Sequence, residues 1–179
     1  MRICRRLFVV PLANNNYGKT TIIRALASQG MGMDFKKYAK GARQLETPFG
    51  RPVDAYIFGR SFQETEKSTY ESVEAALDGN DPQWRTRELI IMPSHVGKND
   101  QTDIQHMIDV AHSAGFDAVA ASVILTTDTG DNRHNFPPIW RMNWDERWTI
   151  PNPWSSDPGG QLQALGRDLW SWVSNALVK

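Results

Sequence analysis

Residues 13–21 read Ala13-Asn14-Asn15-Asn16-Tyr17-Gly18-Lys19-Thr20-Thr21. The apolar run at residues 7–10, just before this stretch, predicts a buried β-strand, and residues 22–27 after it predict a helix that Gly30 ends. A strand, a polar loop and a helix therefore follow one another. Gly18 lets the backbone approach an anion closely, and the loop amides and the helix N-terminus can donate N–H groups to that anion. We therefore expect residues 13–21 to form a phosphate-binding loop.

The end of this loop supplies the charged and metal-binding groups that a nucleotide needs. Lys19 offers a mobile positive charge to the β- and γ-phosphates, and the Thr20 hydroxyl can reach the Mg²⁺ that accompanies them. This order of residues resembles the Walker A motif of the P-loop NTPase superfamily, with Ala13 where the first glycine usually stands. The resemblance implies a P-loop NTPase fold with ATP and Mg²⁺ as cofactors. It assigns nucleotide contacts to Ala13, Asn14, Asn15, Asn16, Tyr17, Gly18, Lys19, Thr20 and Thr21.

The chain has no Asn-Lys-x-Asp sequence for guanine recognition, so adenine is the expected base. Thr126-Thr127-Asp128 stands where that motif would fall, without its lysine. The order of predicted elements also loosely resembles the ParA/MinD-like branch of the superfamily, although Asn14 replaces the extra signature lysine of that branch. Adenine contacts in that branch come from loops after the late strands. The resemblance therefore implies base contacts from Asp128 and Pro151.

A working NTPase usually holds its metal ion or the attacking water with an acid at the end of a neighbouring strand. Residues 88–92 predict that strand, yet Ile91 stands where the acid would be. Glu64 follows another predicted strand at its C-terminal end, where open α/β sheets bind ligands, so we expect it to act on the metal ion together with Thr20. His95 follows residues 88–92 and is expected to face the γ-phosphate. The candidate catalytic residues are Lys19, Glu64 and His95, with Asp54 and Asp128 as alternative acids.

Strands and helices alternate along the chain, which is typical of a parallel sheet with helices on both faces. The predicted strands after the first cover residues 53–59, 88–92 and 116–125, and the predicted helices after the first cover 68–77, 104–111 and 162–176. A capping box of Ser68 and Glu71 is expected to begin the second helix. We therefore predict an α/β fold with three layers, α/β/α, a mostly parallel sheet and a single domain over residues 1–179.

Two further stretches carry distinctive residues. Residues 31–52 are polar, and we expect a solvated loop or short helix with a small basic cluster around Tyr38. The alternative is a mobile segment that reaches over a bound nucleotide. Six of the seven tryptophans lie between Trp140 and Trp172, within the C-terminal part at residues 139–179. Residues 140–144 and 147–150 are candidate strands there. The aromatic residues are expected to pack the last helix onto the sheet, and a partner surface or base-stacking site is the alternative interpretation.

The composition excludes several classes of protein. Basic and acidic residues number 20 each, so no net charge favours nucleic acid or a membrane surface. A single cysteine excludes a disulfide framework, and no apolar run approaches the ~20 residues of a membrane span. Arginines before residues 7–13 imitate a signal peptide, but this run contains Pro11 and leads into the phosphate loop. We therefore expect a cytoplasmic protein whose first strand begins at once.

Three functions are compatible with these patterns. The first is a slow ATPase or ATP-dependent switch that acts with a protein partner or as a homodimer. The second is a small-molecule or nucleotide kinase, in which Arg60 would contact a phosphate of the acceptor. The third is a nucleotide-binding adaptor without turnover that works through its tryptophan-rich C-terminal part.

Overall fold

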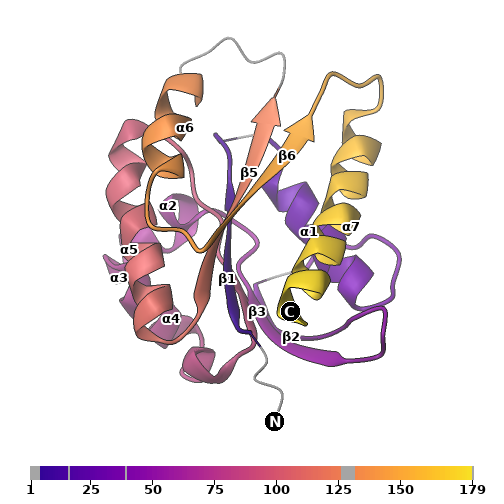
Figure 1. Cartoon of the computed structure of the whole chain (residues 1–179), viewed down its shortest axis with the longest axis horizontal. Helices are drawn as coiled ribbons and strands as arrows, with labels where there is room; N and C mark the ends of the chain where they lie inside the picture. The colour runs from indigo at the N-terminus through magenta and orange to yellow at the C-terminus, as the bar shows by residue number, and fades with distance from the viewer. Residues whose placement is uncertain (1–4, 16, 39, 126–131, 179) are drawn as a thin grey trace.

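The computed structural model describes residues 5–15, 17–38, 40–125 and 132–178. Its centre is a sheet of six strands in the order β2-β3-β4-β1-β5-β6 (Figure 1). The strands are β1 (Leu7–Leu12), β2 (Gly41–Glu46), β3 (Pro52–Ile57), β4 (Leu89–Ile91), β5 (Asp117–Leu125) and β6 (Glu146–Asn152). β2 pairs antiparallel with β3, and the other neighbouring strands pair in parallel. The prediction of an α/β fold with a mostly parallel sheet is confirmed.

Helices cover both faces of this sheet. The helices are α1 (Lys19–Gly30), α2 (Phe62–Thr65), α3 (Lys67–Tyr70), α4 (Val73–Asn80), α5 (Gln101–Ser113), α6 (Asn132–Trp140) and α7 (Pro158–Leu177), with short 3-10 turns η1 (Trp84–Thr86) and η2 (Lys98–Asp100). α1 and α7 lie on one face, and α2 to α6 lie on the other (Figure 1).

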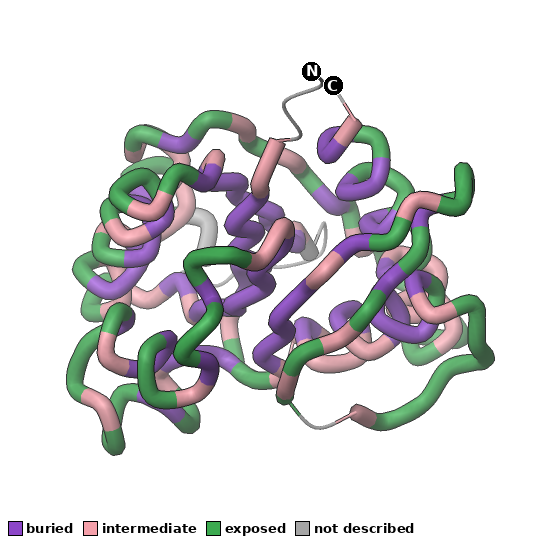
Figure 2. The backbone as a smooth tube through the Cα atoms, turned by 90° about the horizontal axis from the view of Figure 1, so that it is seen from below, coloured by how far each residue is buried: buried purple, intermediate pink, exposed green. Residues whose placement is uncertain are grey.

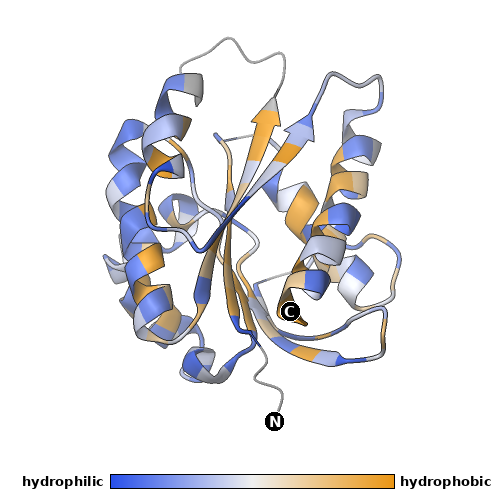
Figure 3. Cartoon of the chain, viewed as in Figure 1, coloured by the Kyte–Doolittle hydropathy of each residue, from blue (hydrophilic) through white to orange (hydrophobic). Residues whose placement is uncertain are grey.

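The alternation of side chains along β1 explains this layering. Leu7 and Val9 pack into the core beneath α1 and α7, whereas Phe8 and Val10 pack into the core beneath α4 and α5. All four are fully buried, because successive residues of a strand point to opposite faces of the sheet. The central strands are accordingly buried in Figure 2 and apolar along much of their length in Figure 3.

Two predictions for elements in the first half of the chain are wrong. Residues 31–52 contain β2, which the sequence pattern did not reveal because only Leu45 of this strand is buried. The capping box at Ser68 and Glu71 does not form. Glu71 adopts a left-handed conformation between α3 and α4, with φ of 64°, and Ser72 caps α4 by accepting a hydrogen bond of 3.1 Å from the Ala75 N–H.

The tryptophan-rich part also differs from its prediction. Residues 132–140 form α6, so the segment 140–144 is not a strand. Trp144 instead folds back, and its Nε1 donates a hydrogen bond of 2.8 Å to the carbonyl of Ile139. The strand predicted at residues 147–150 is confirmed as β6. Trp144 and Trp170 are core residues, whereas Trp154 is 78% exposed, so packing accounts for only some of these aromatic side chains.

The contact between α1 and α7 depends on Gly166. A Cβ atom there would lie 2.4 Å from the Ile22 carbonyl oxygen, which is backbone and cannot move aside. We expect Gly166→Ala to destabilise the fold by about 1–3 kcal/mol despite the better helix propensity of alanine. Thermal unfolding measures this loss. Gly159→Ala in the same helix is the control, because a Cβ there meets nothing within 4 Å, and an equal loss in both variants would contradict the packing argument.

Candidate functional site

The loop between β1 and α1 needs glycine at position 18 for two reasons. Gly18 has φ of 89°, a left-handed backbone conformation that residues other than glycine rarely adopt. A Cβ atom there would also lie 2.6 Å from both Cδ atoms of Leu162 on α7. The Gly18 carbonyl then accepts a hydrogen bond of 3.0 Å from the Ile22 N–H, so α1 starts directly after the loop. Helix α7 therefore supports the loop from one side.

Lys19 lies beneath its own loop. Lys19 is only 6% exposed, and its Nζ donates hydrogen bonds of 2.7 Å to the Ala13 carbonyl and 2.8 Å to the Asn14 carbonyl. Burial lowers the pKa of Lys19 to about 8, while the negative charges of Glu64 and Asp100 act in the opposite direction. The ammonium group is thus held by neutral carbonyl oxygens, which an anion could replace.

A cavity of about 590 Å³ opens above the loop. Its wall comes from the loop, from α1 and from the segment after β3. The lining residues are Asn15, Gly18, Lys19, Thr20, Arg24, Arg60, Ser61 and Glu64. Three of these side chains are cationic and one is a carboxylate, so the cavity favours an anion. Its volume is within the usual range of ligand pockets.

The cavity brings together residues that were predicted from separate parts of the sequence. Thr20 and Glu64 line it from α1 and α2 respectively, and Arg60 lines it from the end of β3. The Ser61 hydroxyl also lines it and is buried without a hydrogen-bond partner among the described residues. A buried hydroxyl without a partner is costly, and a ligand oxygen or water in the cavity would satisfy it.

Glu64 also contacts His95. The His95 Nε2 lies 2.9 Å from the Glu64 Oε1, and the His95 backbone N–H donates a hydrogen bond of 3.1 Å to the Gln63 Oε1. Glu64 faces the cavity, whereas His95 does not belong to the described lining. His95 is therefore placed behind Glu64, where it can orient this carboxylate.

Ser94 follows the end of β4, three residues after Ile91. It forms a parallel bridge with Leu12, so it lies beside the start of the loop between β1 and α1. Its buried hydroxyl accepts a hydrogen bond of 2.9 Å from Gln63 Nε2 and donates one of 2.8 Å to the His95 carbonyl. Gln63 Nε2 also reaches Asp103, whose carboxylate is paired with Lys67 at 2.8 Å. Asp103, which lies on α5, is thus part of a structural network with Gln63 and Lys67.

The remaining predicted contacts are distributed unevenly around the loop. Ala13 is buried and contributes its carbonyl to Lys19, while Tyr17 packs against the core beneath α1 and α7. Asn14 contributes a carbonyl, and Thr21 on α1 is not part of the described lining. Pro151 is exposed on β6, at the same edge of the sheet as the loop but outside this lining. Asn16 and Asp128 lie outside the described residues.

The alternative acid Asp54 is in the wrong place. It lies near the start of β3, at the opposite edge of the sheet from the loop between β1 and α1, and its carboxylate pairs with Arg87 at 2.7 Å. Parallel sheets bind ligands at the carboxyl ends of their strands. Asp54 is therefore a structural residue, and Glu64 is the carboxylate that lines the cavity.

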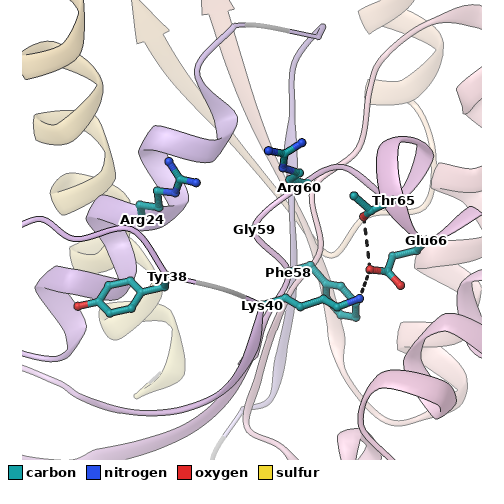
Figure 4. Close-up of a pocket in the computed structure, with 8 residues that line it drawn as sticks. All are labelled: Arg24, Tyr38, Lys40, Phe58, Gly59, Arg60, Thr65 and Glu66. Carbon is teal, nitrogen blue, oxygen red and sulfur yellow. Dashed lines mark hydrogen bonds and ion pairs between the residues drawn. The ribbon is translucent and has the colours of Figure 1, made fainter.

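A second, smaller cavity of about 290 Å³ adjoins the first (Figure 4). The two cavities share Arg24 and Arg60 in their walls. The complete lining is Arg24, Tyr38, Lys40, Phe58, Gly59, Arg60, Thr65 and Glu66. Sequence reasoning did not assign a role to Arg24. Its only sequence signal is a charged residue within the apolar run of α1, five positions after Lys19.

Comparison with known proteins adds no family assignment. No protein-family model matches the chain, and no curated protein sequence matches it significantly. Among the helices that the structure describes, none combines the length and apolarity needed to cross a bilayer.

Proposed function

We propose that this chain is an ATP-binding P-loop NTPase, acting as a slow ATPase or ATP-dependent switch together with a partner. One observation carries the proposal. Lys19 and Glu64, which belong to separate sequence motifs, line one cationic cavity above a glycine-lysine-threonine loop. Positive charge beneath the loop suits a triphosphate, and a carboxylate facing the same space suits a metal ion or an attacking water.

The donor set of the cavity fits Mg²⁺ bound together with phosphate. Within the described ranges, no group of three or more His, Cys, Asp or Glu side chains could hold a metal ion. Mg²⁺ usually keeps several waters and takes one or two carboxylates plus phosphate oxygens. The Thr20 hydroxyl and the Glu64 carboxylate supply such ligands, and the Ser61 hydroxyl is a third oxygen without a described partner. When bound, the ion would neutralise part of the phosphate charge.

The protein side chains then have distinct tasks. Lys19 would exchange its two carbonyl contacts for phosphate oxygens, while Arg24 and Arg60 would neutralise the outer phosphates. Glu64 would hold a water by accepting a hydrogen bond from it. His95 would keep the Glu64 carboxylate in position through its Nε2.

Competition between ATP and GTP, followed by an assay of phosphate release, tests this function. We expect ATP to bind more tightly than GTP, because the sequence lacks the guanine-recognition motif. We also expect slow release of phosphate that needs Mg²⁺. Tighter binding of GTP would reverse the assignment of the base. Binding of ATP without any turnover would support the adaptor function instead of the NTPase.

Binding of ATP should depend on pH through Lys19. The pKa of Lys19 in the protein without nucleotide is about 8. Below that pH, Lys19 is already protonated, and the binding of ATP requires no proton uptake. Above that pH the lysine must gain a proton, since phosphate favours its charged form. The affinity should therefore fall by up to about tenfold per pH unit. Calorimetry near pH 9 in two buffers of different ionisation enthalpy should show proton uptake, and binding without uptake would contradict this role.

Phosphoryl transfer to a small acceptor is a second candidate function. The observation in its favour is that the smaller cavity shares Arg24 and Arg60 with the cavity above the loop, so an acceptor could lie beside the γ-phosphate. Turnover of γ-labelled ATP with phosphorylated metabolites distinguishes the two functions. Label in inorganic phosphate alone supports the hydrolase, whereas label in an organic product supports the kinase.

A further inference from the structure

The smaller cavity carries an excess of positive charge. Arg24, Lys40 and Arg60 line it, and Glu66 is the single carboxylate in the described wall. This wall therefore has a net of two positive charges. Such a concentration of like charge around one hollow raises the local concentration of anions.

Glu66 is already fully engaged within the wall. It is 1% exposed, and its Oε1 pairs with Lys40 Nζ at 2.6 Å (Figure 4). The Oε1 also accepts a hydrogen bond of 3.3 Å from the Thr65 hydroxyl, and the Oε2 accepts one of 2.8 Å from Asn80 Nδ2. Glu66 thus fixes Lys40 in place and leaves the two arginines without a counter-charge from this carboxylate.

Arg24 and Arg60 are the groups that remain to be neutralised. Neither forms an ion pair with a residue in the part of the chain that the structure describes. The Nε of Arg24 is buried and has no hydrogen-bond partner there. Both guanidinium groups lie in the upper part of Figure 4, where the Arg24 side chain comes from α1 and the Arg60 side chain comes from the segment after β3. A guanidinium group donates in a planar fork that matches a phosphate group.

We infer that the smaller cavity binds a phosphate monoester of a small molecule. A phosphate monoester carries about −1.5 to −2 charges at neutral pH, which matches the charge of the wall. Tyr38, which is half-buried, adds aromatic surface for the carbon skeleton of the ligand. A volume of about 290 Å³ lies near the lower limit for ligand pockets and suits a metabolite.

The position of this subsite gives it a relation to the nucleotide. Because Arg24 and Arg60 line both cavities, a monoester there would share its cations with the phosphates above the loop. This relation to the nucleotide rests on the proposed function, to which it adds the chemical class of a second ligand. The binding of the monoester itself depends only on the residues of the smaller cavity.

Calorimetry with glycerol 3-phosphate and ribose 5-phosphate tests the subsite. Each is titrated into the wild-type protein saturated with ADP and Mg²⁺, and into the Lys19→Ala protein without nucleotide. We expect both monoesters to bind in both proteins, and Arg60→Gln to weaken their binding by about tenfold or more, because it removes a charged donor. Arg60 is exposed and forms no ion pair with the residues that the structure describes, so the variant should remain folded. Arg24→Gln gives a second, independent loss.

Several controls make the result decisive. Lys37→Gln removes an exposed cation from the neighbouring loop that lines neither cavity, and it should leave binding unchanged. Ribose and succinate should bind much more weakly than the monoesters. The inference is overturned if dissociation constants exceed about 10 mM, if Arg60→Gln binds like the wild type, or if ADP displaces the monoester. If ADP fails to bind while Lys19→Ala still binds the monoester, the proposed function fails and the subsite stands.

Discussion

Replacing Lys19 with alanine is expected to weaken the binding of ATP with Mg²⁺ by about 10²-fold or more while the protein remains folded. The ammonium group of Lys19 is the cation buried directly beneath the loop, and its two contacts are neutral carbonyl oxygens. No other described cation occupies this place, because Arg24 and Arg60 line the cavity from α1 and from the end of β3. Alanine would therefore remove the charge that the phosphates meet first.

Folding should survive this substitution. The Lys19 side chain contributes two hydrogen bonds to loop carbonyls and belongs to neither hydrophobic core. Water that enters the space left by the lysine side chain can replace those bonds. Lys36→Ala is the matched control, since it removes an exposed lysine outside the cavity. A folded Lys19→Ala protein with unchanged affinity for ATP would refute the P-loop assignment.

The central strands and the loop between β1 and α1 could be predicted because their signals are local. The apolar runs of β1, β4 and β5 are buried on both faces of the sheet, so the sequence alone marks them as strands. β2 could not be predicted in this way. Only Leu45 of its residues is buried, and it is a strand because its backbone pairs with β3 from Gly41 to Glu46. That pairing is a tertiary interaction, which local propensity does not contain.

The candidate site shows the same division. Glu64 was predicted because it follows a strand at its carboxyl end, a rule that depends only on the order of elements. Arg24 could not be predicted, since its position in the wall depends on how α1 packs beside the segment after β3. The smaller cavity combines residues from 24 to 66, and no short motif joins them. Spacing in the sequence therefore located the loop, whereas packing located the second cavity.

The carboxylate of Glu64 is the other group whose loss should have a large effect. It lines the cavity from α2. Its negative charge raises the pKa of Lys19, whereas burial lowers that pKa. Glu64→Gln keeps the size of the side chain and its hydrogen bonding, but it removes the negative charge. We expect turnover of ATP to fall by about 10²-fold or more if the carboxylate acts mainly in the transition state. Binding of ATP in the presence of chelator should change little, because Glu64 acts through the metal ion and water.

Hydrolysis with titrated Mg²⁺ and nucleotide binding in chelator separate these effects. Glu71→Gln is the matched control, because it removes an exposed acid seven residues along the chain that lines neither cavity, and it should hydrolyse ATP like the wild type. His95→Gln should cause a smaller loss than Glu64→Gln, since His95 only positions the carboxylate. If the wild type hydrolyses ATP and Glu64→Gln matches it at every concentration of Mg²⁺, Glu64 is an ordinary surface acid. If the wild type binds ATP without hydrolysing it, the NTPase proposal fails and the result of Lys19→Ala still decides whether the loop binds phosphate.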